Sequence, residues 1–149
     1  MKQLTTFAIL ATLLTLGCNK SSSNNNNTTS CTSGPICTYT LASGETAGTT
    51  AAGIIGTHTL VYDSITAGAP FPHGASAIFE LTTDNKLVVT YNGKCVTLVN
   101  PKKTSASEVS FKDNCQFNVW FAASEKNTGG LNEVNVSSLT GQFYGQFKK

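Results

Sequence analysis

The sequence predicts an all-β domain, on three observations. From Thr57 onward, short runs of β-branched and aromatic residues alternate with Gly, Asn, Asp and Pro, which is typical of strands joined by turns. Asn92-Gly93 lies between two apolar runs and is a strong signal for a two-residue hairpin turn. Four cysteines lie beyond residue 30, and an even number favours disulfide bonds. We expect a small antiparallel barrel, with a β-sandwich as the alternative.

About eight strands can be placed in order along the chain. They are expected at residues 57–65, 76–82, 86–91, 94–99, 108–111, 115–122, 133–138 and 142–147. In the clearest hairpin, the two-residue turn pairs Val89 with Val96 and Leu87 with Leu98, which places four apolar side chains on one face. The preceding segment 42–56 is rich in Ala, Gly and Thr, and it is expected to be a short helix or a loop.

The N-terminus carries an export pattern. Lys2 precedes a mostly apolar run at residues 4–16, and Gly17-Cys18 follows. The run is shorter than the roughly 20 residues that cross a bilayer, and it has the proportions of a signal-peptide core. The segment resembles a bacterial lipoprotein signal, in which a small residue precedes the cysteine that is acylated. Thr15 stands where that family usually has Leu. The alternative is an ordinary signal peptide with a chance cysteine.

This resemblance implies a domain organisation and a cellular location. Residues 1–17 would be the signal peptide, and Cys18 would carry the lipid. Residues 18–30 would form a disordered Ser/Asn/Thr tether, because the segment after Cys18 has no apolar side chain to bury. Residues 31–149 would form one all-β domain with its core in 56–149. The implied location is the bacterial cell envelope, as an outer-membrane lipoprotein that faces the periplasm or the cell surface, with the membrane as a partner through the lipid.

Once Cys18 is assigned to lipid, four cysteines remain for two disulfides. They are Cys31, Cys37, Cys95 and Cys115. Four cysteines allow three connectivities. We favour Cys31–Cys37, because Gly34-Pro35 should turn the chain back, together with Cys95–Cys115 on neighbouring predicted strands. No pair has the short Cys-x-x-Cys spacing of zinc sites, so no metal is expected.

Composition and motifs argue against two classes of function, nucleic-acid binding and catalysis. The net charge is only +2, and all ten basic residues are Lys. Without the planar guanidinium that reads phosphates and bases, nucleic-acid binding is disfavoured. The chain contains no nucleophile elbow, metalloprotease helix or phosphate loop. We therefore expect a protein that is not an enzyme and that needs no cofactor.

The first expected core strand begins Gly56-Thr57-His58-Thr59. It resembles the opening strand of lipocalin-like domains, where Gly-x-Trp starts the barrel; His58 stands in place of the tryptophan here. The resemblance implies a small lipocalin-like barrel that holds a small apolar ligand. That is our first functional hypothesis, and a structural sandwich that binds an envelope partner or carbohydrate is the second.

Four residues are candidates for a binding surface. Phe71 and His73 lie in a turn-rich loop between the first two expected strands, where Phe71 either packs over the barrel end or meets a partner. Trp120 and Tyr144 alternate out of phase with their apolar neighbours, so both should lie on the outer face. Together they would form an aromatic patch suited to carbohydrate or protein, unless residues 42–55 cover it.

Overall fold

The computed structural model describes Cys31 and residues 33–149. The expected signal peptide, the lipidation residue Cys18 and the tether lie outside the described residues. The part of the chain that the structure describes forms ten strands: β1 (Ile36–Thr38), β2 (Gly56–Ser64), β3 (Ser76–Leu81), β4 (Leu87–Tyr91), β5 (Lys94–Val99), β6 (Lys102–Lys103), β7 (Glu108–Asp113), β8 (Val119–Glu125), β9 (Leu131–Ser138) and β10 (Tyr144–Lys148). A short 3-10 helix, η1 (Ala52–Ile54), precedes β2. The described residues contain no helix with the length and hydropathy of a transmembrane span.

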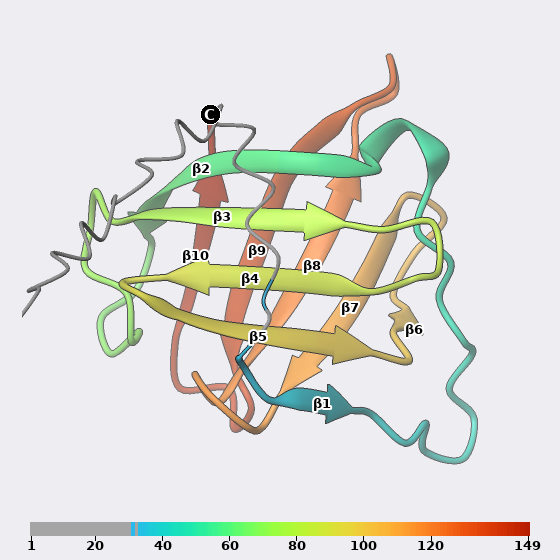
Figure 1. Cartoon of the computed structure of the whole chain (residues 1–149), viewed down its shortest axis with the longest axis horizontal. Helices are drawn as coiled ribbons and strands as arrows, with labels where there is room; N and C mark the ends of the chain where they lie inside the picture. The colour runs from blue at the N-terminus through green and yellow to red at the C-terminus, as the bar shows by residue number, and fades with distance from the viewer. Residues whose placement is uncertain (1–30, 32) are drawn as a thin grey trace, which may run out of the picture.

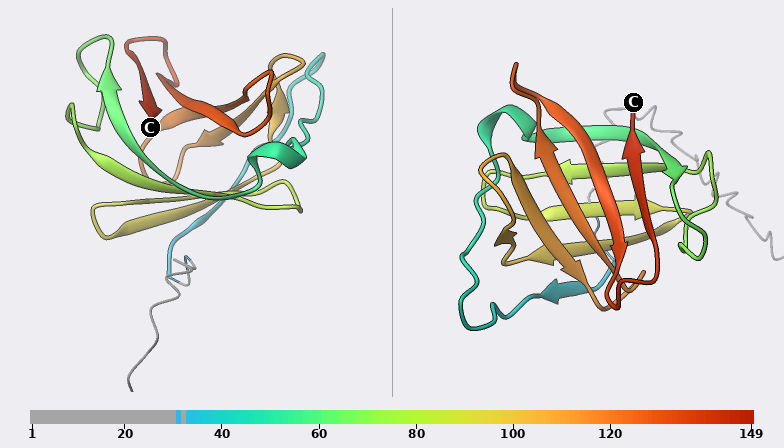
Figure 2. Two further views of the ribbon diagram at one scale, coloured as in Figure 1. Left: turned by 90° about the horizontal axis from the view of Figure 1, so that it is seen from above. Right: turned by 180° about the vertical axis from the view of Figure 1, so that it is seen from behind.

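All ten strands belong to one sheet in the order β1-β5-β4-β3-β2-β10-β9-β8-β7-β6. The sheet curls so that β2–β5 form one half and β7–β10 the facing half, as Figures 1 and 2 show. The pairing of β2 with β10 joins the halves. The prediction of an all-β, barrel-like domain is confirmed. The strand count differs from eight because β1 and β6, of three and two residues, are added at the sheet edges.

The predicted hairpin register is confirmed. Val89 lies opposite Val96 and Leu87 opposite Leu98. The turn uses left-handed backbone at Asn92 and Gly93, with φ of 48° and 73°, which Asn and Gly adopt at little cost.

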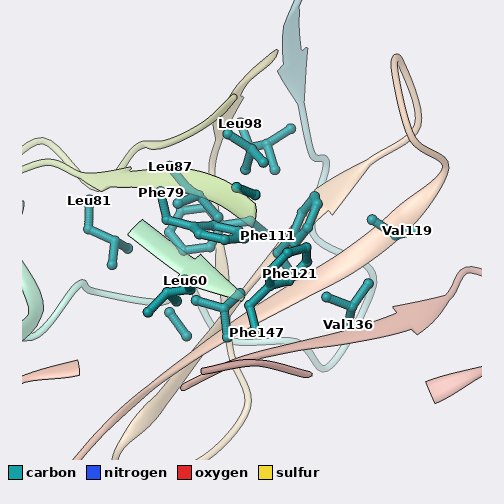
Figure 3. Packing of buried hydrophobic residues seen from close by; sticks show 14 of the residues in the cluster. Leu60, Phe79, Leu81, Leu87, Leu98, Phe111, Val119, Phe121, Val136 and Phe147 are labelled. Atoms are coloured by element: carbon teal, nitrogen blue, oxygen red, sulfur yellow. The ribbon is translucent and has the colours of Figure 1, made fainter. Parts of the chain in front are cut away.

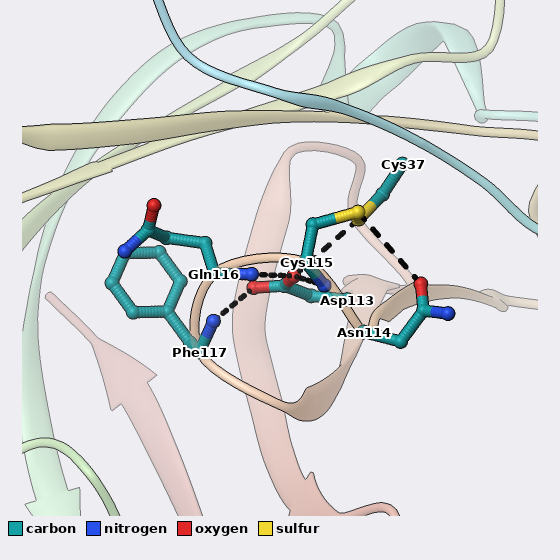
Figure 4. The surroundings of a disulfide bond; sticks show 6 residues. All are labelled: Cys37, Asp113, Asn114, Cys115, Gln116 and Phe117. Atoms are coloured by element: carbon teal, nitrogen blue, oxygen red, sulfur yellow. Dashed lines mark hydrogen bonds between the residues drawn. A yellow bond between two sulfur atoms is a disulfide. The ribbon is translucent and has the colours of Figure 1, made fainter.

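One predicted strand begins later than expected, because Asp113 holds a turn in front of it (Figure 4). Its Oδ1 accepts the backbone N–H groups of Cys115 and Gln116 at 2.9 and 2.8 Å, and its Oδ2 accepts that of Phe117 at 2.8 Å. A strand from residue 115 would need these N–H groups for the sheet. The carboxylate takes them instead, so β8 begins at Val119.

The predicted disulfide connectivity is wrong. The bonds are Cys31–Cys95 and Cys37–Cys115. The chain does not turn back at Pro35, because the Pro35 carbonyl accepts the N–H of Thr97 at 2.9 Å and starts a parallel pairing of β1 with β5. That pairing brings the cysteines near partners 64 and 78 residues away, and the second bond ties β1 to the turn after β7.

The interior between the two halves of the sheet is filled by apolar side chains (Figure 3). Phe71 is part of this core and is only 3% exposed. Its ring centroid lies 5.6 Å from that of Tyr62, 5.5 Å from Phe117 and 5.1 Å from Phe147. The β2–β3 loop therefore turns Phe71 inward. Of the two roles considered for this residue, packing is confirmed, and a place on an exposed binding surface is wrong.

A close approach across the β2–β10 pair fixes how the two halves meet. Tyr62 lies opposite Phe147, and its phenol covers Gly145 on the neighbouring strand. Any side chain at Gly145 would overlap the phenol ring. Glycine at this position therefore allows the aromatic ring to lie across the junction.

We expect Phe71→Ala to lower the free energy of unfolding by about 3–5 kcal/mol, because it empties the centre of the aromatic core. Urea unfolding followed by Trp120 fluorescence would measure the loss. Val61→Ala is the control: Val61 is 46% exposed on the outer face of β2, and we expect its truncation to change stability by about 0.5 kcal/mol or less. A Phe71→Ala protein as stable as the control would contradict the packing role.

Candidate functional site

Trp120 and Tyr144 lie in one row across the outer face of the sheet. Ser137 of β9 is opposite Trp120 of β8 on one side and opposite Tyr144 of β10 on the other. Two strand spacings therefore separate the aromatic residues, or roughly 10 Å. The row continues to Lys112 of β7, which is opposite Trp120. The predicted outward placement of both aromatics is confirmed, and the strand register brings them to one site.

A groove of about 360 Å³ lies between these aromatics. Its floor consists of small side chains on three adjacent strands, Ser110, Ala122 and Ser137. Larger side chains at these positions would fill the space, so the hollow follows from the sequence of the outward positions. The rim is formed by Lys102, Thr104, Glu108, Trp120, Asn135 and Tyr144.

One wall of the groove is a hydrogen-bonded chain. The Tyr144 hydroxyl donates to Asn135 Oδ1 at 2.6 Å, and Asn135 Nδ2 donates to Glu108 Oε2 at 3.2 Å. These bonds fix the orientation of the Asn135 amide and leave lone pairs on all three side chains. Tyr144 is 40% exposed, so its ring remains accessible beside these polar groups.

The opposite wall is Trp120, which is half-buried. Tyr39 packs edge-on against it with ring centroids 5.1 Å apart, and Lys102 Nζ lies 4.3 Å from the Trp120 ring centroid. Part of Trp120 is therefore covered by Tyr39, which lies before the residues 42–55 that the alternative hypothesis named, and Tyr144 stays exposed. The uncovered part of the ring lines the groove.

Glu45 holds this wall together. Its carboxylate accepts hydrogen bonds from the Lys102 ammonium and the Ala42 N–H, both at 2.8 Å, and from the Tyr39 hydroxyl. The Lys102 bond, followed by the bonds from Tyr39 and Ala42, lowers the pKa of Glu45 to about 2. The carboxylate is thus ionised in ordinary conditions and fixes Tyr39 and Lys102 against Trp120.

His73 lies outside the groove. Its side chain is 76% exposed, and its Nδ1 is 3.5 Å from Asp63 Oδ1. Asp63 is opposite Gln146 of β10, which is opposite Asn135, so the pair lies on the same outer face beyond the groove. The hydrogen bond from Lys148 is the main cause that lowers the pKa of Asp63.

Sequence reasoning did not identify Lys102, Glu108, Ser110, Ala122, Asn135 and Ser137 as groove residues. Alternation does indicate that Asn135 faces outward between Val134 and Val136. The register of β6 to β10 is what places it beside Glu108 and Tyr144, and no short motif encodes that register.

Two other clefts are less suited to ligand binding than the groove. A cleft of about 500 Å³ lies between residues 39–48 and the β3–β4 turn. Its charged side chains, Asp84 and Lys86, pair with each other at 2.6 Å. A cleft of about 330 Å³ lies beside η1 and residues 103–109. Neither combines accessible aromatic faces with a row of polar groups.

Three potential metal ligands come together at Cys37, Asp113 and Cys115. The two sulfur atoms are bonded to each other. The Asp113 oxygens already accept three backbone N–H groups. This cluster therefore stabilises the fold, and its sulfur and oxygen atoms are not arranged to bind a metal ion.

Comparison of the chain with protein-family models, with curated proteins and with solved structures found no match.

The Glu45 clamp makes a pH-dependent contribution to stability. Its pKa in the folded protein is lowered from 4.5 to about 2, so the stabilisation is present above pH 4.5 and is lost as the pH falls toward about 2. We expect Glu45→Gln to lower the urea midpoint at neutral pH and to match the parent protein near pH 2. Glu80→Gln, on the outer face of β3, is the control. A Glu45→Gln deficit that is the same at both pH values would contradict the ionic clamp.

Proposed function

We propose that the protein is a lipid-anchored module of the bacterial cell envelope that binds a glycan in the outer groove and is not an enzyme. The observation that carries this proposal is the cross-strand row in which Trp120 and Tyr144 flank Ser137 over a floor of small side chains.

The groove matches the chemistry of sugars. Pyranose rings have apolar C–H faces that stack on aromatic rings, and Trp and Tyr combine such a face with a polar edge. Their hydroxyl groups need a few well-placed acceptors and donors. The oriented Asn135 amide and the Glu108 carboxylate supply these next to Tyr144. The separation of the aromatics, about two strand spacings or ~10 Å, is comparable with the length of a disaccharide.

The packing of the interior supports the outer groove over the barrel interior as the binding site. Phe71 occupies the space between the sheet halves in which our first hypothesis placed an apolar ligand, and it contacts Tyr62, Phe121 and Phe147 there. An apolar ligand would have to displace this ring. The lipocalin-like relationship is a separate proposal, supported by the up-and-down order of β2–β5 and β7–β10.

The non-enzymatic role is supported by the acids in the groove. Glycoside hydrolysis ordinarily uses two carboxyl groups that flank the bond to be broken. Among the described residues that line the groove, Glu108 is the single acid, and Asn135 holds one of its oxygens. We therefore propose binding without turnover.

The anchor is supported by the sequence before residue 19 and by the disulfides. The run at residues 4–16 and the Gly17-Cys18 pair fit a lipoprotein signal. The two disulfides use four of the five cysteines, and Cys18 is the fifth. The lipoprotein hypothesis requires that Cys18 stay out of the disulfides and that the other cysteines pair with each other.

Native electrophoresis in gels that contain soluble polysaccharides tests the groove. We expect at least one polysaccharide to retard the protein. Tyr144→Ala should weaken that retention by about tenfold, since a stacking partner is lost, and Trp120→Ala should do the same. Val61→Ala, which removes an exposed apolar side chain from another part of the outer face, should have no effect. Retention that survives both aromatic substitutions, or no retention across the panel, would overturn the proposal.

Intact mass of the natively purified protein tests the anchor. We expect a chain that starts at Cys18, carries a diacyl or triacyl addition and is four hydrogens lighter than its reduced form, because two disulfides are present. Cys18→Ser should abolish the lipid mass. A lipid-free mature chain that starts elsewhere would overturn the lipoprotein assignment and leave the groove hypothesis intact.

A further inference from the structure

Two sides of the groove carry charge of opposite sign: the side at Trp120 is basic, and the side at Asn135 is acidic. On the Trp120 side, Lys102 Nζ and Lys112 Nζ lie 4.3 and 5.7 Å from the ring centroid. The Glu45 carboxylate pairs with Lys102 at 2.8 Å. Lys112 forms no ion pair with any described carboxylate, so this side retains one uncompensated ammonium group.

The side of the groove at Asn135 is acidic. Glu108 of β7, four residues along the same strand from Lys112, lines the groove there and accepts a hydrogen bond from Asn135. Glu133 is in the same cross-strand row as Glu108, with Ser124 between them. Partial burial, together with the charges of Glu133 and Glu108, raises the pKa of Tyr144, which is the response expected of a phenol beside anions.

We propose that the glycan is acidic, with a carboxylated sugar stacked at Trp120 and its carboxylate on Lys112, and with the hydroxyl groups of the neighbouring sugar on Asn135 and Glu108. This inference rests on the proposed function. Charge complementarity carries it, because an anionic group beside Asn135 would meet Glu108, while one beside Trp120 meets a free ammonium. The polarity of the groove thus sets the direction of the bound chain.

Lys112 is well placed for this role. It is held opposite Trp120 in the sheet register, and its Nζ lies 5.4 Å from the Tyr39 ring centroid. Two aromatic rings therefore hold the ammonium beside Trp120, next to the groove. A substituent that projects from a sugar on Trp120 reaches this ammonium without entering the floor of the groove.

Trp120 is the only tryptophan in the chain, so its fluorescence reports directly on this side of the groove. Titration of the full chain with oligogalacturonate and with its methyl ester compares the same sugar skeleton with and without charge. We expect the acid form to bind about fivefold more tightly at low salt, as one exposed charge pair provides. The difference should shrink as salt rises.

Three variants locate the effect. Lys112→Gln should abolish the preference for the acid form over the ester, whereas Lys112→Arg should keep the preference. Lys94→Gln is the control, because it removes the same charge from the β4–β5 hairpin in the other half of the sheet.

The outcomes separate this inference from the proposed function. Equal affinity for acid and ester overturns the acidic-glycan inference and leaves glycan binding in place. A preference that persists in Lys112→Gln overturns the role of Lys112. Polyglutamate that binds as tightly as oligogalacturonate shows that the site takes acidic peptides, which overturns the sugar assignment. A fluorescence signal that responds to neither sugar form overturns both proposals.

Discussion

The pairing of β2 with β10 is the interaction on which the rest of the structure depends. It joins two antiparallel meanders into one curled sheet, and it sets Tyr62 opposite Phe147 at the junction. Because Gly145 has no side chain, the Tyr62 ring lies across β10, and the inward faces of the two halves close around a single aromatic core. The outward face of β7–β10 is covered in part by Tyr39, and the groove lies on the part that stays open. Core and groove thus use alternate residues of the same strands.

Much of the fold could be predicted because it is encoded locally. Period-2 alternation located the main strands, and the Asn92-Gly93 turn determined the register of its hairpin, since each signal depends on a few neighbouring residues. The disulfide pairing could not be predicted, because it follows from the parallel contact of β1 with β5. Asp113 was also missed: its effect on the start of β8 depends on one buried carboxylate accepting three N–H groups.

The site was predictable in part for the same reason. The outward placement of Trp120 and Tyr144 follows from alternation within single strands. Their position on either side of Ser137 depends on two strand registers, and the covering of Trp120 by Tyr39 depends on the path of the N-terminal segment. Phe71 shows the limit of reasoning from loops. An apolar residue between two prolines in a turn-rich loop has no periodic partner in the sequence, and the aromatic rings that surround it in the fold are what place it inward.

The Cys31–Cys95 bond governs how the domain would respond to tension. Any pull that arrives from the N-terminal side of Cys31 passes through a covalent bond to the start of β5, and a second covalent bond at Cys37 lies behind it. The three-residue strand β1, which hydrogen bonds alone would hold weakly, is therefore shielded from peeling. The segment between residues 31 and 95 cannot lengthen while the Cys31–Cys95 disulfide is intact, so the sheet would keep its structure under such a force.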